Sequence, residues 1–317
     1  NNMNESVLSF KNKYFGDKNF YKMTLTIAIP IIIQNLLTNL VSMADNIMVG
    51  QLGTNQMSGV AIINQLFFVF NLLVFGMSGA GLFSAQYFGQ KNHNGVRDVF
   101  RMKILIGIAI IAISLSVMIF LHEPLINMFL HEGSSSGNIQ ETFNYAKNYL
   151  YIMVIGIAPF VISNCYNTTL KESGQTVVPM KAGVLAVVFD IVLNYIFIFG
   201  KLGFPAMGVV GAAIATVISR FVECGYLVIY THRHSNDYPF IKHCYRTLKV
   251  PGSLVKKIIV TGTPLMLNEF LWAGGLTLQT QALSTKGLAT VGGLNICNTI
   301  GNISNCIFVT MGTTIAI

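Results

Sequence analysis

Long apolar runs separated by short polar connections dominate this sequence. Residues 104–121 and 150–162 are two examples, and each approaches the roughly 20 residues that an α-helix needs to cross a bilayer. Hydrophobic residues make up 53% of the chain and charged residues only 10%, whereas a soluble domain carries about 25% charged residues. A soluble fold could not cover so much apolar surface. The sequence therefore predicts an all-α integral membrane protein.

The apolar runs define eight predicted spans and a polar start to the chain. The spans cover residues 22–49, 57–88, 102–121, 143–170, 183–200, 207–230, 257–283 and 289–317. Residues 1–21 are polar with scattered lysines and lack the apolar core and small-residue cleavage site of a signal peptide. We expect this segment to be a cytoplasmic tail. The five cysteines show no Cys-x-x-Cys spacing, so packed thiols are expected in place of disulfides or metal ligands.

Lys and Arg residues alternate between connections in a way that predicts the orientation of the spans. Sixteen lie in the tail and in the connections after the second, fourth and sixth spans, and three, Lys147, Lys201 and Lys286, lie in the others. Because cytoplasmic loops carry an excess of Lys and Arg, we expect a multi-pass protein of the plasma (inner) membrane with a cytoplasmic N-terminus. The net charge of +8 then faces membrane lipid, and nucleic acid is not an expected partner.

The two ends of the chain resemble each other. A shift of 234 residues aligns, without a gap, Lys22 with Lys256, Pro30 with Pro264, Leu37 with Leu271, Gly53 with Gly287, Gly59 with Gly293, Ile62 with Ile296, Asn64 with Asn298, Asn71 with Asn305 and Met77 with Met311. Six spans separate the two copies, so both begin on the same side of the membrane. The pattern predicts a two-lobe bundle with a parallel internal repeat.

This repeat suggests a division of the chain into lobes. We expect an N-terminal lobe of six transmembrane helices at 22–230, a cytoplasmic inter-lobe loop at 231–256, and the first two helices of a C-terminal lobe at 257–317. The last predicted span has no polar flank. With six helices expected in each lobe and eight spans present, we expect the C-terminal lobe to be incomplete in this sequence.

Several motifs then resemble a known family, in the correct order along the whole chain. They are Ile29-Pro30-Ile31 with ADNIMVGQLG at 44–53, LKESGQT at 170–176 with Pro179-Met180, NYIFIFG at 194–200, PAMG at 205–208 and GAAIAT at 211–216. These segments are similar to the multidrug and toxic compound extrusion (MATE) transporters. The resemblance implies two six-helix lobes and export driven by Na⁺ or H⁺.

Four acidic residues fall inside predicted spans: Asp45, Asp190, Glu223 and Glu269. A charge at the bilayer centre costs roughly 2.5–3.5 kcal/mol on insertion scales, so such residues are functional candidates. Asp190 follows Lys181 by nine residues, or about 14 Å of helix, which places it near mid-membrane. Asn194 lies one turn later on the same face, so both side chains can reach one cation or proton.

The family resemblance implies a cation or proton site in the N-terminal lobe, built from Asp45, Asp190, Asn194 and Thr216. One departure affects the fifth span, where the family pattern is Asn followed by Asp and this sequence has Asp190 followed by Asn194. The swap moves the charge by one turn. The alternatives are that Asp190 is only a structural hydrogen-bond partner and that Asp45, about 30 Å along its helix from Leu25, is a solvated acid at the boundary.

Other polar residues in the spans give weaker indications. The resemblance places Glu269 in a C-lobe cation site, although it could instead pack against Asn268 or Trp272. Pro30 and Pro264 are expected to bend their helices, or are simply tolerated there. Arg220 and Glu223 are three residues apart, which favours a self-neutralising packing pair. Candidate cavity-lining residues are Gln34, Asn35, Asn39, Asn64, Gln65, Asn71, Gln279 and Gln281, which could equally bind helix to helix.

An enzyme is not indicated. The Gly-x-Ser-x-Gly pattern at 133–137 lies in a loop without the strand-to-helix turn of a nucleophile elbow, no nucleotide-binding loop is present, and the six histidines lack a zinc-binding spacing. We therefore expect a monomeric secondary efflux antiporter that exports small organic cations in exchange for Na⁺ or H⁺ and needs no cofactor. The alternatives are a lipid-linked oligosaccharide flippase of related architecture and a non-transporting membrane scaffold or enzyme.

Overall fold

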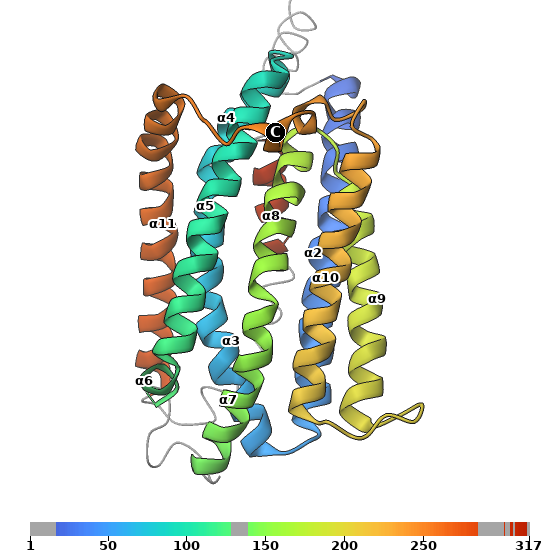
Figure 1. The fold of residues 1–317 in the computed structure, drawn as a ribbon, viewed down its shortest axis with the longest axis vertical. Coiled ribbons are helices and arrows are strands. Elements are labelled where there is room, and N and C mark those ends of the chain that lie inside the picture. Colours follow the sequence, from blue (N-terminus) through green and yellow to red (C-terminus); the bar gives the residue numbers. More distant parts are fainter. Residues whose placement is uncertain (1–16, 128–138, 285–300, 302–304, 307, 316–317) are drawn as a thin grey trace, which may run out of the picture.

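The computed structural model describes residues 17–127, 139–284, 301, 305–306 and 308–315. The regular elements that it describes are helical (Figure 1). They are α2 (Lys18–Gly50), α3 (Thr54–Phe75), α4 (Ser78–Gly89), α5 (His93–Phe120), α6 (His122–Asn127), α7 (Ile139–Ile155), α8 (Ile157–Glu172), α9 (Val177–Phe199), α10 (Val209–Arg233), η1 (Pro239–Ile241), η2 (Cys244–Arg246) and α11 (Gly252–Ser284). The prediction of an all-α chain is confirmed.

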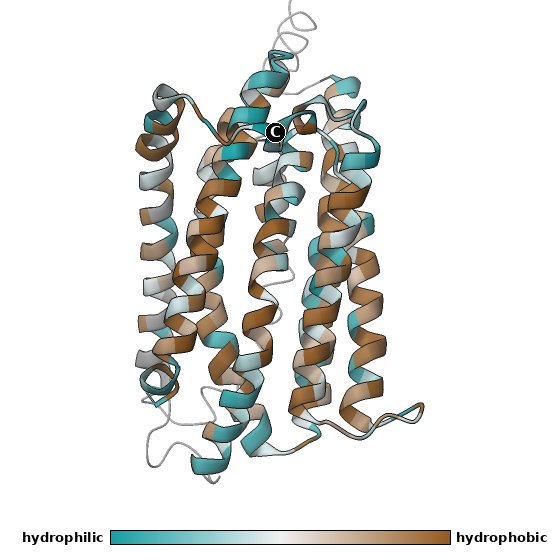
Figure 2. Cartoon of the chain, viewed as in Figure 1, coloured by the Kyte–Doolittle hydropathy of each residue, from teal (hydrophilic) through white to brown (hydrophobic). Residues whose placement is uncertain are grey.

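The long helices run side by side along the length of the molecule (Figure 1). Helices α2, α3, α5, α9 and α10 are each long and apolar enough to cross a membrane, and α7 with α8 forms a sixth such unit if the bent pair is one span. Apolar residues cover the middle of the bundle and polar residues gather toward its two ends (Figure 2). This distribution is that of a multi-pass membrane protein.

Two of the predicted continuous spans are broken in the structure. The span expected at 57–88 is divided into α3 and α4, and the span expected at 143–170 is divided into α7 and α8, which are bent by 47°. At the second break the Gly156 amide donates to the carbonyl of Met153, three residues earlier in the chain. In a regular α-helix the acceptor would be the residue four positions earlier. A Cβ on Gly156 would lie within 3.1–3.2 Å of Val217 and Arg220, so α10 packs against the break through a position that has no side chain.

Helices α2 and α11 match each other in the register predicted by the internal repeat. Both contain 33 residues, and their bounds coincide under the shift of 234 residues. Pro30 and Pro264 lie inside these helices at the same distance from the start. The correspondence supports the parallel repeat, which otherwise remains a prediction.

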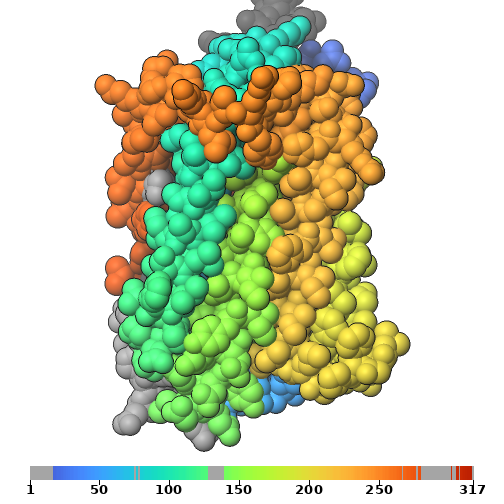
Figure 3. All heavy atoms as spheres, in the orientation of Figure 1, coloured from blue at the N-terminus to red at the C-terminus, as the bar shows by residue number. Residues whose placement is uncertain are grey.

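The connection between α10 and α11 packs against one end of the bundle. We call this end, where α2 begins and α4 ends, the basic end, because it carries Lys18, Lys22, Lys91, Arg97, Arg101, Lys242, Arg246, Lys249, Lys256 and Lys257. The connection crosses it over α5 and α8 (Figure 3). It covers residues 234–251, shorter than the expected 231–256, because α10 continues to Arg233 and α11 begins at Gly252.

Two arginines of α5 hold this connection in place. Arg97 donates to the carbonyls of Pro239 and Phe240 at 3.2 and 3.3 Å, and Arg101 donates to the carbonyls of Cys244 and His243 at 2.9 and 3.0 Å. Phe240 and Cys244 are buried. Burial also raises the pKa of the Cys244 thiol. Arg97 and Arg101, which served in the sequence only to predict the orientation of the spans, therefore also hold the connection against the bundle.

A buried ion pair joins α5 to α8 near the same end. Lys103, whose side chain is fully buried, donates to both carboxylate oxygens of Glu172 at 2.7 and 2.6 Å. Its ammonium also donates to the hydroxyls of Thr168 and Thr169 at 3.1 and 3.3 Å. A buried ammonium with this many partners is fully satisfied, and removing either charge would leave the other buried and unpaired.

We predict that Lys103→Met lowers the free energy of unfolding by about 3–5 kcal/mol, because it leaves Glu172 buried without its cation. Thermal unfolding of the purified protein in detergent measures the change as a lower melting temperature. The matched control is Lys147→Met, since Lys147 lies 3.5 Å from Glu123 in a pair whose side chains are 31% and 60% exposed, and such pairs contribute about 0–1 kcal/mol. Equal melting temperatures for the two variants would contradict the prediction.

We also predict that the Cys244 thiol reacts slowly with a maleimide at neutral pH, because it is buried and its pKa is raised. The double substitution Arg97→Gln with Arg101→Gln should accelerate the reaction severalfold by releasing the connection. Mass spectrometry of the labelled peptide separates Cys244 from the other thiols. Lys91→Gln, at an exposed site on the same end, should leave the rate unchanged.

Candidate functional site

Side chains from α2 and α9 meet inside the bundle at an amide that bridges two carboxyl groups. Asn194 donates through Nδ2 to Asp45 Oδ1 at 2.7 Å and to Asp190 Oδ2 at 3.2 Å. Asp190 and Asn194 are almost fully buried, at 4% and 1% exposed, and Asp45 is partly buried. The structure thus brings together two acids that are 145 positions apart in the sequence. We call Asp45, Asp190 and Asn194 the acid–amide cluster.

Helix α10 completes the surroundings of Asp190. Ser219 donates from Oγ to Asp190 Oδ1 at 3.1 Å, and the same Oγ lies 2.8 Å from the backbone carbonyl oxygen of Thr216. The sequence analysis predicted Thr216 but missed Ser219. Because Ser219 lies three residues after Thr216, the two share one face of α10, and this spacing was the available signal.

The hairpin between α9 and α10 positions these two helices against each other. Gly200 ends α9 in a left-handed conformation with φ of 66°, and a Cβ there would lie 2.5 Å from the Ala206 nitrogen. Only glycine adopts this geometry without strain. This tight turn keeps α9 and α10 packed against each other, and Ser219 therefore lies opposite Asp190.

Asn194 Nδ2 thus holds the carboxyl groups of Asp45 and Asp190 next to each other. Two ionised carboxylates held this close repel each other, so the pair favours the binding of one proton or another cation. The remaining Asn194 oxygen, Oδ1, is buried without a hydrogen-bond partner in the described structure. Chemically, the cluster can hold and release a proton or another small cation.

Comparison with known proteins identifies the family of this chain. The family model described as MatE matches residues 30–196, a region that includes both acids of the acid–amide cluster. The chain belongs to the MATE family. This membership confirms the resemblance noted in the motifs.

Curated MATE relatives are similar over most of this chain. A probable multidrug resistance protein NorM from Thermotoga maritima is 31% identical over 278 residues, which cover 87% of this chain and 57% of that protein. A probable multidrug resistance protein NorM from Halalkalibacterium halodurans is 30% identical, with 85% of this chain and 57% of the relative covered. The chain therefore spans little more than half the length of these relatives.

Solved structures of transporters share the fold. A crystal structure of MATE in complex with MaD3S matches 92% of this chain and 64% of its own chain, with a TM-score of 0.78 and 23% identity. A MOP superfamily transporter from Pyrococcus furiosus matches with a TM-score of 0.75 and 23% identity, covering 92% of this chain and 62% of that one. At this identity the likeness supports the helical architecture.

Arg220 and Glu223 are not the contact pair that the sequence suggested for this MATE protein. The Arg220 guanidinium lies over the rings of Phe67 and Phe160, 5.4 and 5.0 Å from their centroids, and its Nη1 donates to the Gly156 carbonyl at 3.5 Å. Glu223 interacts electrostatically with Lys171 of α8 as well as with Arg220. The sequence analysis missed the aromatic faces and the helix break, because they come from α3, α7 and α8, which the spacing within one helix cannot reveal.

Glu269 lies on α11 outside the acid–amide cluster. Its side chain is exposed in the described structure. The role implied for it by the family resemblance remains a prediction. Pro30 and Pro264 lie within α2 and α11 as expected.

The candidate cavity-lining residues have different environments. Asn35 donates to Thr310 at 3.1 Å and so joins α2 to the chain of the predicted second lobe, while Gln34 is buried against Gly183 of α9. Asn71 is partly buried. Asn39, Asn64, Gln65 and Gln279 are exposed, and the Gln281 side chain lies outside the described residues. Cavity lining remains a prediction for this set.

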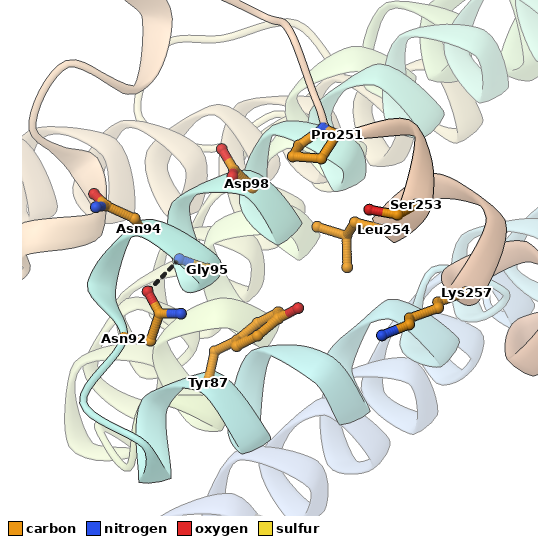
Figure 4. A pocket seen from close by; sticks show the side chains of 9 residues that line it. All are labelled: Tyr87, Asn92, Asn94, Gly95, Asp98, Pro251, Ser253, Leu254 and Lys257. Carbon is orange, nitrogen blue, oxygen red and sulfur yellow. Dashed lines mark hydrogen bonds between the residues drawn. The ribbon is translucent and has the colours of Figure 1, made fainter.

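A cavity of about 240 Å³ lies at the basic end (Figure 4), and none of its lining residues belongs to the acid–amide cluster. Tyr87 and Asp98 border it from α4 and α5, and Leu254 and Lys257 border it from α11. The Asp98 carboxylate accepts from Arg101 at 3.0 Å. The cavity is therefore a cleft between α11 and the start of α5, separate from the site of the two acids.

We predict that Asn194→Ala destabilises the protein by about 1.5–3 kcal/mol, because it removes a donor shared by two buried carboxyl groups. The melting temperature in detergent should fall accordingly. Asn164→Ala is the matched control, since Asn164 is a partly buried asparagine that donates only to the Phe160 carbonyl of its own helix. A fall in melting temperature no larger than that of the control would show that the bridge contributes nothing to stability.

Proposed function

We propose that this protein is a secondary active efflux antiporter of the plasma membrane, with a cytoplasmic N-terminus. It exports small organic cations by alternating access in exchange for H⁺ or Na⁺, and the exchange is coupled through the acid–amide cluster. The names of the NorM relatives, which describe probable multidrug resistance proteins, support export of drugs. The complete transporter then contains two lobes that rock around a shared cavity.

The observation that carries this proposal is the bridge between Asp45 and Asp190. A carboxylate in the membrane interior is costly unless it is paired or hydrated, and here two acids share one amide donor. Loss of a bound proton places two negative charges side by side, which favours uptake of another cation or a rearrangement of α2 against α9. Binding and release of a cation can therefore be linked to movement within the N-terminal lobe.

Described basic side chains inside the bundle favour cationic over anionic substrates. Lys103 is neutralised by Glu172, and Arg220 is held by two aromatic faces and a carbonyl. A flippase for lipid-linked oligosaccharides would need basic groups free to hold a pyrophosphate. These two groups are already engaged, which favours the efflux antiporter over this alternative.

The proposal predicts that Asp190→Asn abolishes export while preserving the volume of the side chain and one of its two accepting oxygens. Cells that produce the full-length variant should accumulate a fluorescent organic cation as strongly as cells without the transporter, because the site can no longer bind and release charge. Accumulation is compared at equal membrane expression.

Asp237→Asn is the matched control, because it makes the same chemical change at an exposed residue of the connection after α10. It should leave export unchanged. Export by Asp190→Asn at the unsubstituted rate and at normal expression would remove Asp190 from the coupling mechanism.

A further inference from the structure

The α10–α11 connection is fixed to the N-terminal lobe by directional contacts. Arg97 and Arg101 of α5 donate to four of its backbone carbonyls. Tyr245 adds a side-chain contact, because its hydroxyl forms a hydrogen bond with the hydroxyl of Tyr166 on α8. The Tyr245 ring also stacks on that of His232 on α10, with the centroids 5.8 Å apart. Three helices of the lobe therefore hold the connection as far as η2.

Apolar packing fixes the same part of the connection. Tyr238, Phe240 and Ile241 are buried, and the Phe240 ring meets the fully buried ring of Phe100 on α5 at a centroid distance of 5.6 Å. Burial of large apolar side chains favours the packed state. The connection up to η2 is therefore packed as part of the N-terminal lobe, and not as a loose loop.

The chain changes character after η2 ends at Arg246. Residues 247–249 are exposed and Val250 is partly buried, and no hydrogen bond or ion pair holds these four residues in the described structure. Pro251 follows, and α11 begins at Gly252. Residues 247–251 are therefore a short link between the fastened connection and α11.

Helix α11 meets the N-terminal lobe through glycine and apolar side chains. A Cβ on Gly79 of α4 would lie 2.7 Å from the Gly262 Cα of α11, so the two backbones touch at this point. Nearer the basic end, Leu254 and Ile258 of α11 join a buried apolar cluster with side chains of α4 and α5. Because hydrophobic contacts are non-directional, such a surface can part without leaving hydrogen-bonding groups unpaired.

The cavity at the basic end lies on this seam. Tyr87 and Asp98 border it from the side of α4 and α5, and Ser253 and Lys257 border it from α11 (Figure 4). Protein interiors are normally close-packed, so the open space shows that the two sides fit each other incompletely here. The lobes are therefore expected to part between α11 and the pair α4 and α5, and not within the fastened connection.

We propose that the α10–α11 connection moves with the N-terminal lobe and that residues 247–251 are the tether that limits separation of the lobes at the basic end. The inference rests on the alternating access of the proposed function and adds the place where the lobes part. Five extended residues span at most about 18 Å, whereas the whole connection, residues 234–251, would span about 65 Å. Fastening by Arg97 and Arg101 thus shortens the reach of the link roughly threefold.

Distances between spin labels on the full-length protein in nanodiscs test this proposal. The labels are noncanonical amino acids at three exposed positions: Gln90 at the end of α4, Arg246 at the end of η2, and Lys256 on α11. The distance between positions 90 and 246 should stay narrowly distributed with and without an organic cation, because both positions belong to one rigid unit. A broad distribution for this pair would overturn the proposal.

The double substitution Arg97→Gln with Arg101→Gln removes the fastening. It should broaden the distribution between positions 90 and 246 severalfold, and it should extend the longest distances between positions 90 and 256. Lys242→Gln is the matched control, since Lys242 is an exposed basic residue that binds Asn236 within the same connection, and it should change neither distribution. Unchanged distributions in the double variant would contradict the role of the two arginines.

Lengthening the tether tests its limit without touching the arginines, and decides the matter if the double variant does not fold. About eight Gly and Ser residues inserted after Leu248 add a flexible link. The distances between positions 90 and 256 should lengthen while those between positions 90 and 246 stay narrow. No lengthening would show that the tether does not limit the lobes. These distances are measured without transport, so a failure to export organic cations would count against the proposed function alone.

Discussion

A carboxylate inside a membrane protein needs a partner, and the shared bridge between Asp45 and Asp190 is the interaction on which the N-terminal lobe depends. The amide and one acid come from α9, the other acid comes from α2, and the Ser219 hydroxyl comes from α10. No single helix could satisfy both acids. Packing of α2, α9 and α10 is therefore also the means by which two costly charges are held in the interior.

Sequence alone predicted those parts of the structure that depend on local spacing. The length of the apolar runs predicted the helices, and the one-turn separation of Asp190 and Asn194 placed both on one face. The shift of 234 residues matches the bounds of α2 and α11 to the residue. In each case the information lies within one helix or one repeated segment, where helical periodicity fixes the relative positions of the side chains.

The features that sequence missed depend on contacts between distant segments. The break at Gly156 lies within an unbroken apolar run, so hydropathy gives no sign of it, and Arg220 packs against it from α10. Lys103 meets Glu172 across 69 positions. Arg97 and Arg101 resembled ordinary orienting charges, although both bind carbonyls more than 140 positions away. Tertiary packing determines which partner each charged side chain contacts. The spacing of residues within one helix does not reveal that partner.

Charged groups are paired differently at the basic end of the bundle and at its centre. At the basic end the Lys103 ammonium has a carboxylate and two hydroxyls, and the α10–α11 connection is fastened by two arginines. In the acid–amide cluster, by contrast, the hydrogen bonds described for the two acids come from the neutral donors Asn194 and Ser219. A conformational change that follows ion binding needs a group whose charge changes when the ion binds. It also needs surroundings that do not already neutralise the charge of that group. The centre meets that condition and the basic end does not, so movement of α2 against α9 can be driven from the cluster while the basic end keeps α5 and α8 together.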